Sequence, residues 1–220
     1  VNLARVGRAR VRLNRGDEAG AAADAAMVPD GFLYEFPYSS LDASTENKVH
    51  VLLERELMAT VQPEYRNMAF QGQPDPRVDV FDLGVQGPGT DIQIWSTTKY
   101  SSLEAPVPVA TWEEAQLIQA EVALNNGQLQ QAVGFINALH AKVGLPDFVS
   151  NDAAEIREQL LYERAAELFL EGQHMQDLER FNLELIPAPG TPFYHGGFYG
   201  DQICFPLPDV EYLNNPNISR

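Results

Sequence analysis

The chain has 220 residues, of which 45% are apolar and 21% charged, a composition typical of a globular protein long enough to bury a sizeable core. Its formal net charge is −16, although five of the 15 basic residues lie within the first 15 positions: Arg5, Arg8, Arg10, Arg12 and Arg15. The rest carries 10 basic against 31 acidic residues, a charge that repels phosphate backbones and argues against nucleic-acid binding. The arginine run has two interpretations, a helix face that pairs with the acidic body or a basic recognition arm.

The single cysteine, Cys204, excludes an intrachain disulfide and a multi-cysteine metal site. Its apolar neighbours favour an inert, buried thiol. No stretch approaches the ~18–20 apolar residues needed to span a bilayer. Since the chain begins directly in helical sequence, we expect either that a signal was removed or that an upstream part is missing.

Two helical segments, 3–14 and 17–26, are followed by a turn at 28–31, which predicts a helical hairpin over 1–31. The same layout returns over 121–136. Five residue pairs coincide when 10–25 is aligned with 121–136: Val11/Val122, Leu13/Leu124, Asn14/Asn125, Gly16/Gly127 and Ala21/Ala132. Glycine allows the left-handed backbone of a tight helix reversal, and small alanines permit close packing. The pattern predicts tetratricopeptide-like hairpins separated by an insertion.

Residues 32–110 form this insertion, in which aromatic residues and prolines occur in irregular order. We expect a short helix over Val49–Val61, a strand over 91–100, and loop elsewhere. The fold class is therefore mainly α, with helical hairpins and a large loop-rich insertion.

A helical framework is expected over 111–186. Its last helix should run from Asp152 to Phe181, capped by Asn151 or Asp152 and weakened at Gly172. A proline-rich, loop-like segment over 187–220 closes the chain. We treat the whole as a single domain, 1–220, that lacks its N-terminal part.

Three carboxylates at spacings of four, Glu163, Glu167 and Glu171, share one helix face. Ion pairing, for example of Arg164 with Glu167, is the favoured interpretation, and an acid/base pair of a glycosidase is the weaker one. The four histidines lack metal-binding spacing, and Asp79 and Asp82 lack the oxygen-rich loop of a calcium site. No catalytic motif or cofactor site stands out.

Five aromatic residues of the insertion are candidate ligand contacts: Tyr65, Phe70, Phe81, Trp95 and Tyr100. They lie on or beside loops rich in polar residues, and sugars present apolar C–H faces ringed by hydroxyls. The alternative is that these rings anchor loops onto the helical body. The glycine- and aromatic-rich run from His195 to Gly200 is interpreted as a mobile loop.

Three segments resemble the SusD/RagB family. The first spans Glu114–Pro146, and the second, the most specific, runs from Glu163-Arg164 through Glu171-Gly172 to Arg180-Phe181. The third is Phe205-Pro-Leu-Pro208, then Glu211 and Asn215-Pro216-Asn217. The family pattern is not matched at four positions: His140, Lys142 and His174 replace arginines, and Thr111 stands where an arginine is common.

The resemblance implies a non-catalytic outer-membrane lipoprotein that captures an oligosaccharide, or in related members a peptide. It also implies a partner, a SusC-like TonB-dependent transporter, which receives the ligand at the extracellular face. The lipid anchor would lie upstream of Val1. A helical-repeat protein that assembles with other surface proteins is the second hypothesis, and an acidic carbohydrate-active enzyme is the third.

Overall fold

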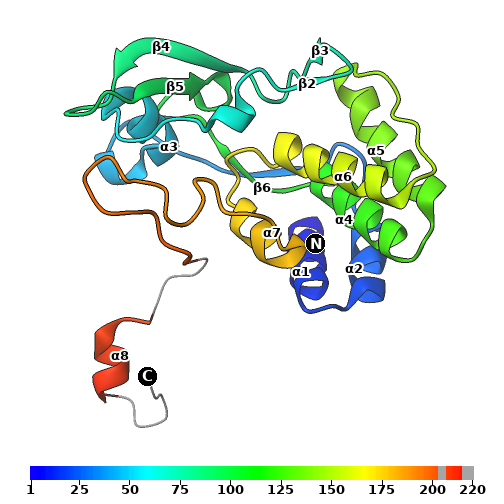
Figure 1. Cartoon of the computed structure of the whole chain (residues 1–220). Coiled ribbons are helices and arrows are strands. Elements are labelled where there is room, and N and C mark those ends of the chain that lie inside the picture. Colours follow the sequence, from blue (N-terminus) through cyan, green and yellow to red (C-terminus); the bar gives the residue numbers. More distant parts are fainter. Residues whose placement is uncertain (203–206, 215–220) are drawn as a thin grey trace. The chain divides into compact units, whose positions relative to one another are not determined.

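The chain folds into helices joined by short two-stranded ribbons, as a computed structural model shows for residues 1–202 and 207–214 (Figure 1). It divides into two compact units, Val1–Gln173 and His174–Arg220. The first unit contains both predicted hairpins and the insertion. The mainly α fold class is confirmed.

Two helical hairpins form the framework of the first unit. Helices α1 (Asn2–Asn14) and α2 (Glu18–Ala25) form one, and α4 (Trp112–Asn125) and α5 (Leu129–Val143) form the other. Each reversal contains a glycine with positive φ, 77° at Gly16 and 71° at Gly127. The repeated Asn-x-Gly pattern therefore marks two equivalent turns, as predicted.

Helix α4 lies between two apolar clusters. Ile118 and Val122 face α1 and α2, while Leu117 and Ala120 face α5 and α6 (Ala153–Glu167). A helix enclosed in this way is apolar on several faces rather than along a single stripe. Helix α4 therefore packs against the helices that precede the insertion, α1 and α2, and against those that follow it, α5 and α6.

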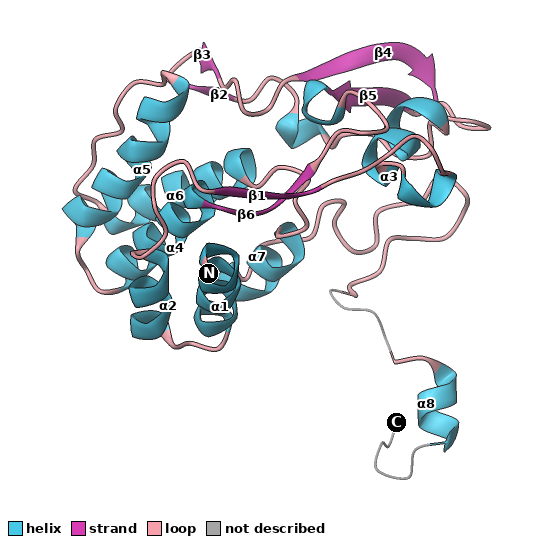
Figure 2. Ribbon diagram, turned by 180° about the vertical axis from the view of Figure 1, so that it is seen from behind, coloured by secondary structure: helices cyan, strands magenta, loops and turns pink. Residues whose placement is uncertain are grey.

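The insertion leaves and re-enters the helical framework through an antiparallel ribbon of β1 (Leu33–Phe36) and β6 (Val107–Thr111), visible in Figure 2. Two further ribbons lie inside it, β4 (Val80–Gln86) with β5 (Gln93–Thr97) and the short β2 (Ala69–Phe70) with β3 (Gln73–Pro74). Only the strand over 91–100 was expected, and β5 confirms its central part. The prediction of loop for the others was wrong because two-stranded ribbons with exposed faces need no strict apolar alternation.

The helix expected over Val49–Val61 is shorter than predicted. It begins at α3 (Lys48–His50), capped by Asn47, widens into a π-helical turn over Val51–Arg55, and ends before Leu57, whose φ is 54°. The chain then runs beside β5, where Thr60 accepts a hydrogen bond from the Trp95 backbone. The hydrogen bond of Thr60 with β5 thus replaces the helical hydrogen bonds that the prediction required here.

The helix expected over 152–181 is two helices, α6 and α7 (His174–Phe181). Asp152 caps the first, as predicted, by accepting hydrogen bonds from the Ala154 and Glu155 amides. Leu170 and Gly172 then adopt positive φ values, which an α-helix cannot include. The break falls at the predicted weak point, Gly172, and coincides with the boundary between the two units.

The second unit contains α7, a segment with a β-bridge between Pro192 and Phe198, and α8 (Asp209–Asn214). Helix α8 was missed because six residues are too few to show a helical period, although Asp209 and Glu211 in its first turn favour a helix start. Cys204 and parts of the closing motif, Phe205-Pro206 and Asn215–Asn217, lie outside the described residues.

Candidate functional site

An arginine of the insertion, Arg77, joins the insertion to α6. Its side chain is buried and bonds Asp75 twice, with Nη2 2.6 Å from Oδ2 and Nε 2.9 Å from Oδ1. Its Nη1 atom lies 2.6 Å from Glu163 Oε2 and 3.1 Å from Glu167 Oε2. The Tyr162 hydroxyl completes the set by donating to Asp75 over 3.0 Å. One guanidinium thus binds three carboxylates at the contact between insertion and framework.

Glu163 also meets the framework histidine, His140. The imidazole Nε2 lies 2.8 Å from Glu163 Oε1, and Nδ1 lies 2.6 Å from the Pro146 carbonyl oxygen. Burial alone would lower the pKa of His140, but the hydrogen bond and charge of Glu163 raise it overall. Burial likewise would raise the pKa of Glu163, yet His140 and Arg77 hold it below its usual range. Glu163 thus stabilises the charged forms of both cations, although Arg77 itself opposes the charge on His140.

The other two carboxylates of the row meet cations of the insertion. Lys99 lies 2.7 Å from Glu171, and Arg77 reaches Glu167. Burial raises the pKa of Glu167 to about 7, although Arg77 opposes the shift. Arg164, the predicted partner of Glu167, lies 3.8 Å from Glu121 of α4. The ion-pairing interpretation therefore holds, but the cations come from the insertion and from α5. We call these residues the ionic junction: Arg77, Lys99, His140, Glu163, Glu167 and Glu171.

Three of the five candidate rings lie against the helical framework. Phe70, 8% exposed, packs edge-on to His140 with ring centroids 4.6 Å apart. Tyr65 contacts Phe169 at 4.9 Å. Tyr100 is 1% exposed and donates through its hydroxyl to the Leu170 carbonyl over 3.3 Å. These contacts match the anchoring alternative weighed from the sequence.

The remaining two rings, Trp95 and Phe81, belong to the β4–β5 ribbon. Phe81 is 38% exposed, and Trp95 is partly buried, with the Arg66 guanidinium 4.8 Å from its ring centre. Phe81 pairs with Ser96 and Trp95 with Asp82, so the two rings occupy opposite faces of the ribbon. The five rings therefore do not line one groove. Figures 1 and 2 place this ribbon and α3 at one end of the first unit, away from the helical hairpins.

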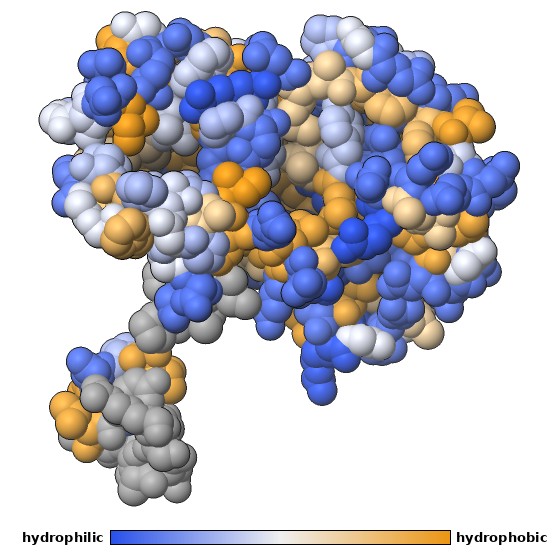
Figure 3. Space-filling view, viewed as in Figure 1, coloured by the Kyte–Doolittle hydropathy of each residue, from blue (hydrophilic) through white to orange (hydrophobic). Residues whose placement is uncertain are grey.

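The N-terminal arginines pair with the acidic body, which confirms the first interpretation of that run. Arg8 Nε and Arg12 Nη1 each lie 2.7 Å from Asp24 Oδ2, and Arg10 Nε lies 2.6 Å from Glu114 Oε1. The hydrogen bond from Arg8 lowers the pKa of Asp24. Hydrophilic residues cover most of the face shown in Figure 3, with apolar residues in smaller patches between them.

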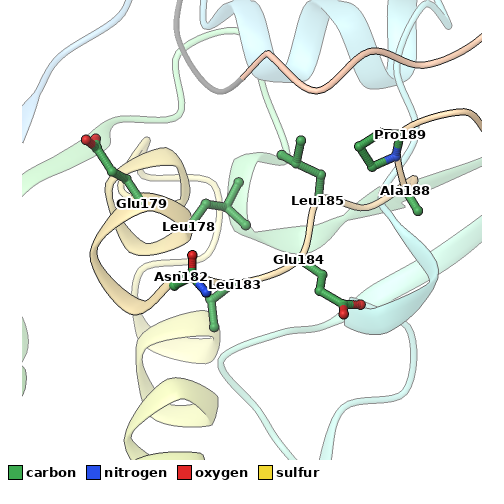
Figure 4. Close-up of a pocket in the computed structure, with 8 residues that line it drawn as sticks. All are labelled: Leu178, Glu179, Asn182, Leu183, Glu184, Leu185, Ala188 and Pro189. Atoms are coloured by element: carbon green, nitrogen blue, oxygen red, sulfur yellow. The ribbon is translucent and has the colours of Figure 1, made fainter.

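A pocket of about 660 Å³ lies within the second unit (Figure 4). Leu178, Asn182 and Leu183 at the end of α7 form one wall, and Leu185, Ala188 and Pro189 form the other. Its volume lies in the range of ligand-binding pockets, ~300–1,000 Å³. Sequence reasoning missed this pocket, because its walls form only when the chain turns back after Phe181.

The residues that the structure describes contain neither a metal-binding group of side chains nor a membrane-spanning helix. No group of three or more His, Cys, Asp and Glu side chains in it is arranged to hold a metal ion. Nor does any helix within residues 1–202 and 207–214 combine the length and apolar composition needed to cross a membrane.

Comparison with known proteins identifies the family. The model of the SusD family matches residues 95–218, more than half of the chain. The chain belongs to the SusD family. This match begins within β5 and covers the helical framework after the insertion and most of the second unit. No curated protein matches the sequence.

Solved structures with SusD names share the fold. A SusD superfamily protein from Parabacteroides distasonis is 16% identical with a TM-score of 0.68, covering 98% of this chain and 61% of that protein. A SusD-like carbohydrate binding protein from Bacteroides vulgatus is 15% identical with a TM-score of 0.66, covering 97% and 58%. A SusD-like protein from Bacteroides fragilis is 16% identical with a TM-score of 0.62, covering 81% and 54%. The chain thus spans little more than half the length of these relatives.

The ionic junction accounts for one departure from the SusD family pattern. His140 stands where the pattern has an arginine, and its two ring nitrogens both face oxygen acceptors, Glu163 and the Pro146 carbonyl. A doubly protonated imidazole satisfies both acceptors. Protonated in this way, the histidine pairs with Glu163 at the position where the pattern has an arginine.

Proposed function

We propose that this SusD family member is a non-catalytic, cell-surface subunit that binds a nutrient, foremost an oligosaccharide, and passes it to a SusC-like TonB-dependent transporter. Membership of the SusD family carries the proposal, because this is a family of binding proteins. The ligand class follows from the Bacteroides vulgatus relative described as carbohydrate binding. Peptides are the second ligand class. The proposal includes an upstream lipid anchor that holds the protein on the extracellular face of the outer membrane.

The arrangement of carboxylates supports a binding role over the enzyme hypothesis. A glycosidase needs two carboxyl groups facing one another across a cleft, roughly 5–10 Å apart, one of them free to donate a proton. Glu163, Glu167 and Glu171 instead contact Arg77 and Lys99, which hold the insertion in place. Their chemistry is structural.

The β4–β5 ribbon is the proposed ligand surface among the five candidate rings. Phe81 offers an exposed ring on one face of the ribbon, whereas Trp95, on the opposite face, is partly buried and lies beside Arg66. Polar groups stand beside Trp95, since Gln93 donates to Asp82 over 2.6 Å on the same face of the ribbon. Flat rings bordered by amides and carboxylates suit the alternating apolar and hydroxyl surfaces of a sugar. Tyr65, Phe70 and Tyr100 would instead hold the insertion against the helices.

Isothermal titration calorimetry against neutral oligosaccharides and peptides tests the proposal. We expect millimolar or tighter binding of an oligosaccharide, weakened at least tenfold by Phe81→Ala or by Trp95→Ala, according to which face of the ribbon the sugar contacts. Trp95→Phe preserves much of the ring packing and reports whether a loss reflects misfolding. Val85→Ala is the matched control, because Val85 is an exposed residue of the same strand without a ring.

Absence of binding at millimolar ligand would overturn the capture function. The assembly hypothesis would then be tested by co-purification with other surface proteins. Binding of a ligand with unchanged affinity in both ring variants would leave capture standing but remove the β4–β5 ribbon as its surface.

A further inference from the structure

The segment over 190–199 turns back on itself as a small hairpin with one β-bridge, Pro192 to Phe198. Four backbone hydrogen bonds close it: Gly190 N to Tyr199 O at 2.8 Å, Tyr199 N to Thr191 O at 2.9 Å, Phe193 N to Gly197 O at 3.0 Å, and Gly196 N to Phe193 O at 2.9 Å. Gly196 and Gly197 have φ values of 93° and 82°, which the reversal requires. The two consecutive glycines of the sequence therefore fix the position of this turn.

Aromatic rings cluster around Phe193 in this hairpin. Its ring centre lies 4.6 Å from that of Tyr194, 5.8 Å from that of His195 and 5.2 Å from that of Tyr199. Tyr194 and His195 also contact each other at 4.1 Å. Rings at such distances pack against one another and restrict one another's orientation. The hairpin therefore carries a preorganised aromatic cluster.

This cluster is open to solvent. Tyr194 is 51% exposed, and Phe198, opposite Pro192 in the bridge, is 72% exposed. A hairpin with four closing hydrogen bonds gains nothing in folding from leaving large rings in water, since burial of apolar surface is what stabilises. Exposed aromatic groups rimmed by polar atoms mark interaction sites.

The hairpin adjoins the pocket of the second unit. Ala188 and Pro189 line that pocket, and the Thr191 amide donates to the Ala188 carbonyl over 3.1 Å. The pocket wall and the base of the hairpin are thus one continuous stretch of chain. An apolar recess and an aromatic cluster lie within the same unit.

We propose that the hairpin over 190–199, with the adjoining pocket, binds a neutral sugar residue of the captured oligosaccharide. Its exposed rings offer faces for the C–H surface of a pyranose, and the Tyr194 hydroxyl and His195 ring nitrogens offer hydrogen bonds to sugar hydroxyls. Glu179 and Glu184 at the pocket and the net charge of −16 disfavour acidic sugars. The inference rests on the proposed capture function and adds a binding surface distinct from the β4–β5 ribbon.

The test uses the full chain and calorimetry with maltoheptaose, xylohexaose, cellohexaose, mannohexaose and laminarihexaose. For whichever of these the wild-type protein binds, Tyr194→Ala and Phe198→Ala should each weaken binding about tenfold, the effect of removing one well-placed ring. Phe36→Ala is the matched control, being an exposed aromatic substitution in the β1–β6 ribbon. It should leave affinity within twofold.

The outcomes separate the two proposals. Binding that survives both hairpin substitutions but is lost in Phe81→Ala or Trp95→Ala overturns the hairpin site and leaves capture intact. If Phe36→Ala weakens binding as much as the hairpin variants do, the hairpin site is overturned too, since the effect would not be specific to the hairpin. Wild-type protein that binds none of the five sugars overturns the capture of neutral sugars, and the hairpin site with it. A hairpin whose variants lose a peptide ligand instead contradicts the sugar assignment.

Discussion

Replacement of Arg77 by methionine should destabilise the first unit by about 3 kcal/mol. Removing one partner of a buried ion pair costs ~3–5 kcal/mol because the remaining charge is uncompensated. The lower end applies here, because Glu163 keeps its contacts with His140 and Gln159. Asp75 is affected most, since its carboxylate would retain only the Tyr162 hydroxyl and the backbone amide of residue 77. Methionine matches the aliphatic stem of arginine, so packing losses stay small.

Urea denaturation followed by tryptophan fluorescence measures this loss through Trp95 and Trp112. A thermal melt gives a second measurement: at ~2–4 °C per kcal/mol for a chain of this size, the melting temperature should fall by about 6–12 °C. Adding Asp75→Asn to the methionine variant should recover about 1–2 kcal/mol, because the uncompensated charge is removed.

Arg55→Met serves as the control for this experiment. Arg55 also lies in the insertion and bonds a carboxylate, Glu46, but its side chain is 46% exposed. Glu46 is buried, but the guanidinium is half-exposed and Lys48 stays 3.5 Å from the carboxylate, so this variant should lose only about 1 kcal/mol, less than the Arg77 variant. The reasoning fails if both arginine variants lose equally little stability, or if Asp75→Asn restores none of it.

Further predictions concern pH and the hairpin turns. Glu167 keeps its proton in the folded state up to its raised pKa of about 7, against 4.5 when unfolded, so its contribution to stability declines as pH rises through this window. Glu167→Gln should therefore be as stable as wild type at pH 4 and more stable by ~2–3 kcal/mol at pH 8, measured by urea denaturation at both pH values; an equal difference at both would contradict the burial argument. Gly127→Ala should destabilise the protein by about 1 kcal/mol because the φ of Gly127 is 71°. Gly134→Ala, at an exposed position of α5, should stabilise it by a similar amount in thermal melts. Opposite signs are the diagnostic result.

The helical framework could be predicted because its signals are local. The Asn-x-Gly turns at Gly16 and Gly127 and the cap at Asp152 each act over a few residues, and each lies where expected. The break after α6 was anticipated only as a weakness at Gly172. Its full form depends on Tyr100, 70 residues away, which bonds the Leu170 carbonyl that the ended helix leaves free.

The candidate site depended on contacts that no local pattern reveals. Arg77 looks like an ordinary loop arginine, yet its buried carboxylates lie 86 and 90 residues further along the chain. The sequence pointed to aromatic residues of the insertion but not to their orientation, which packing against the helices determines. A signal for the hairpin over 190–199 was present in its paired Phe-Tyr dipeptides around Gly196-Gly197, which together have the composition of a turn with facing aromatic arms.

The attachment of the insertion separates the residues that keep it folded from the residues that face solvent. Arg77, Phe70 and Tyr100 fix it to the helices from within, while exposed positions of β4 such as Phe81 and Val85 take no part in that attachment. Substitutions at exposed positions away from such contacts usually change stability by less than ~0.5 kcal/mol. Ligand preference could therefore diverge among related proteins by replacement of outer side chains alone, with the same framework retained beneath them.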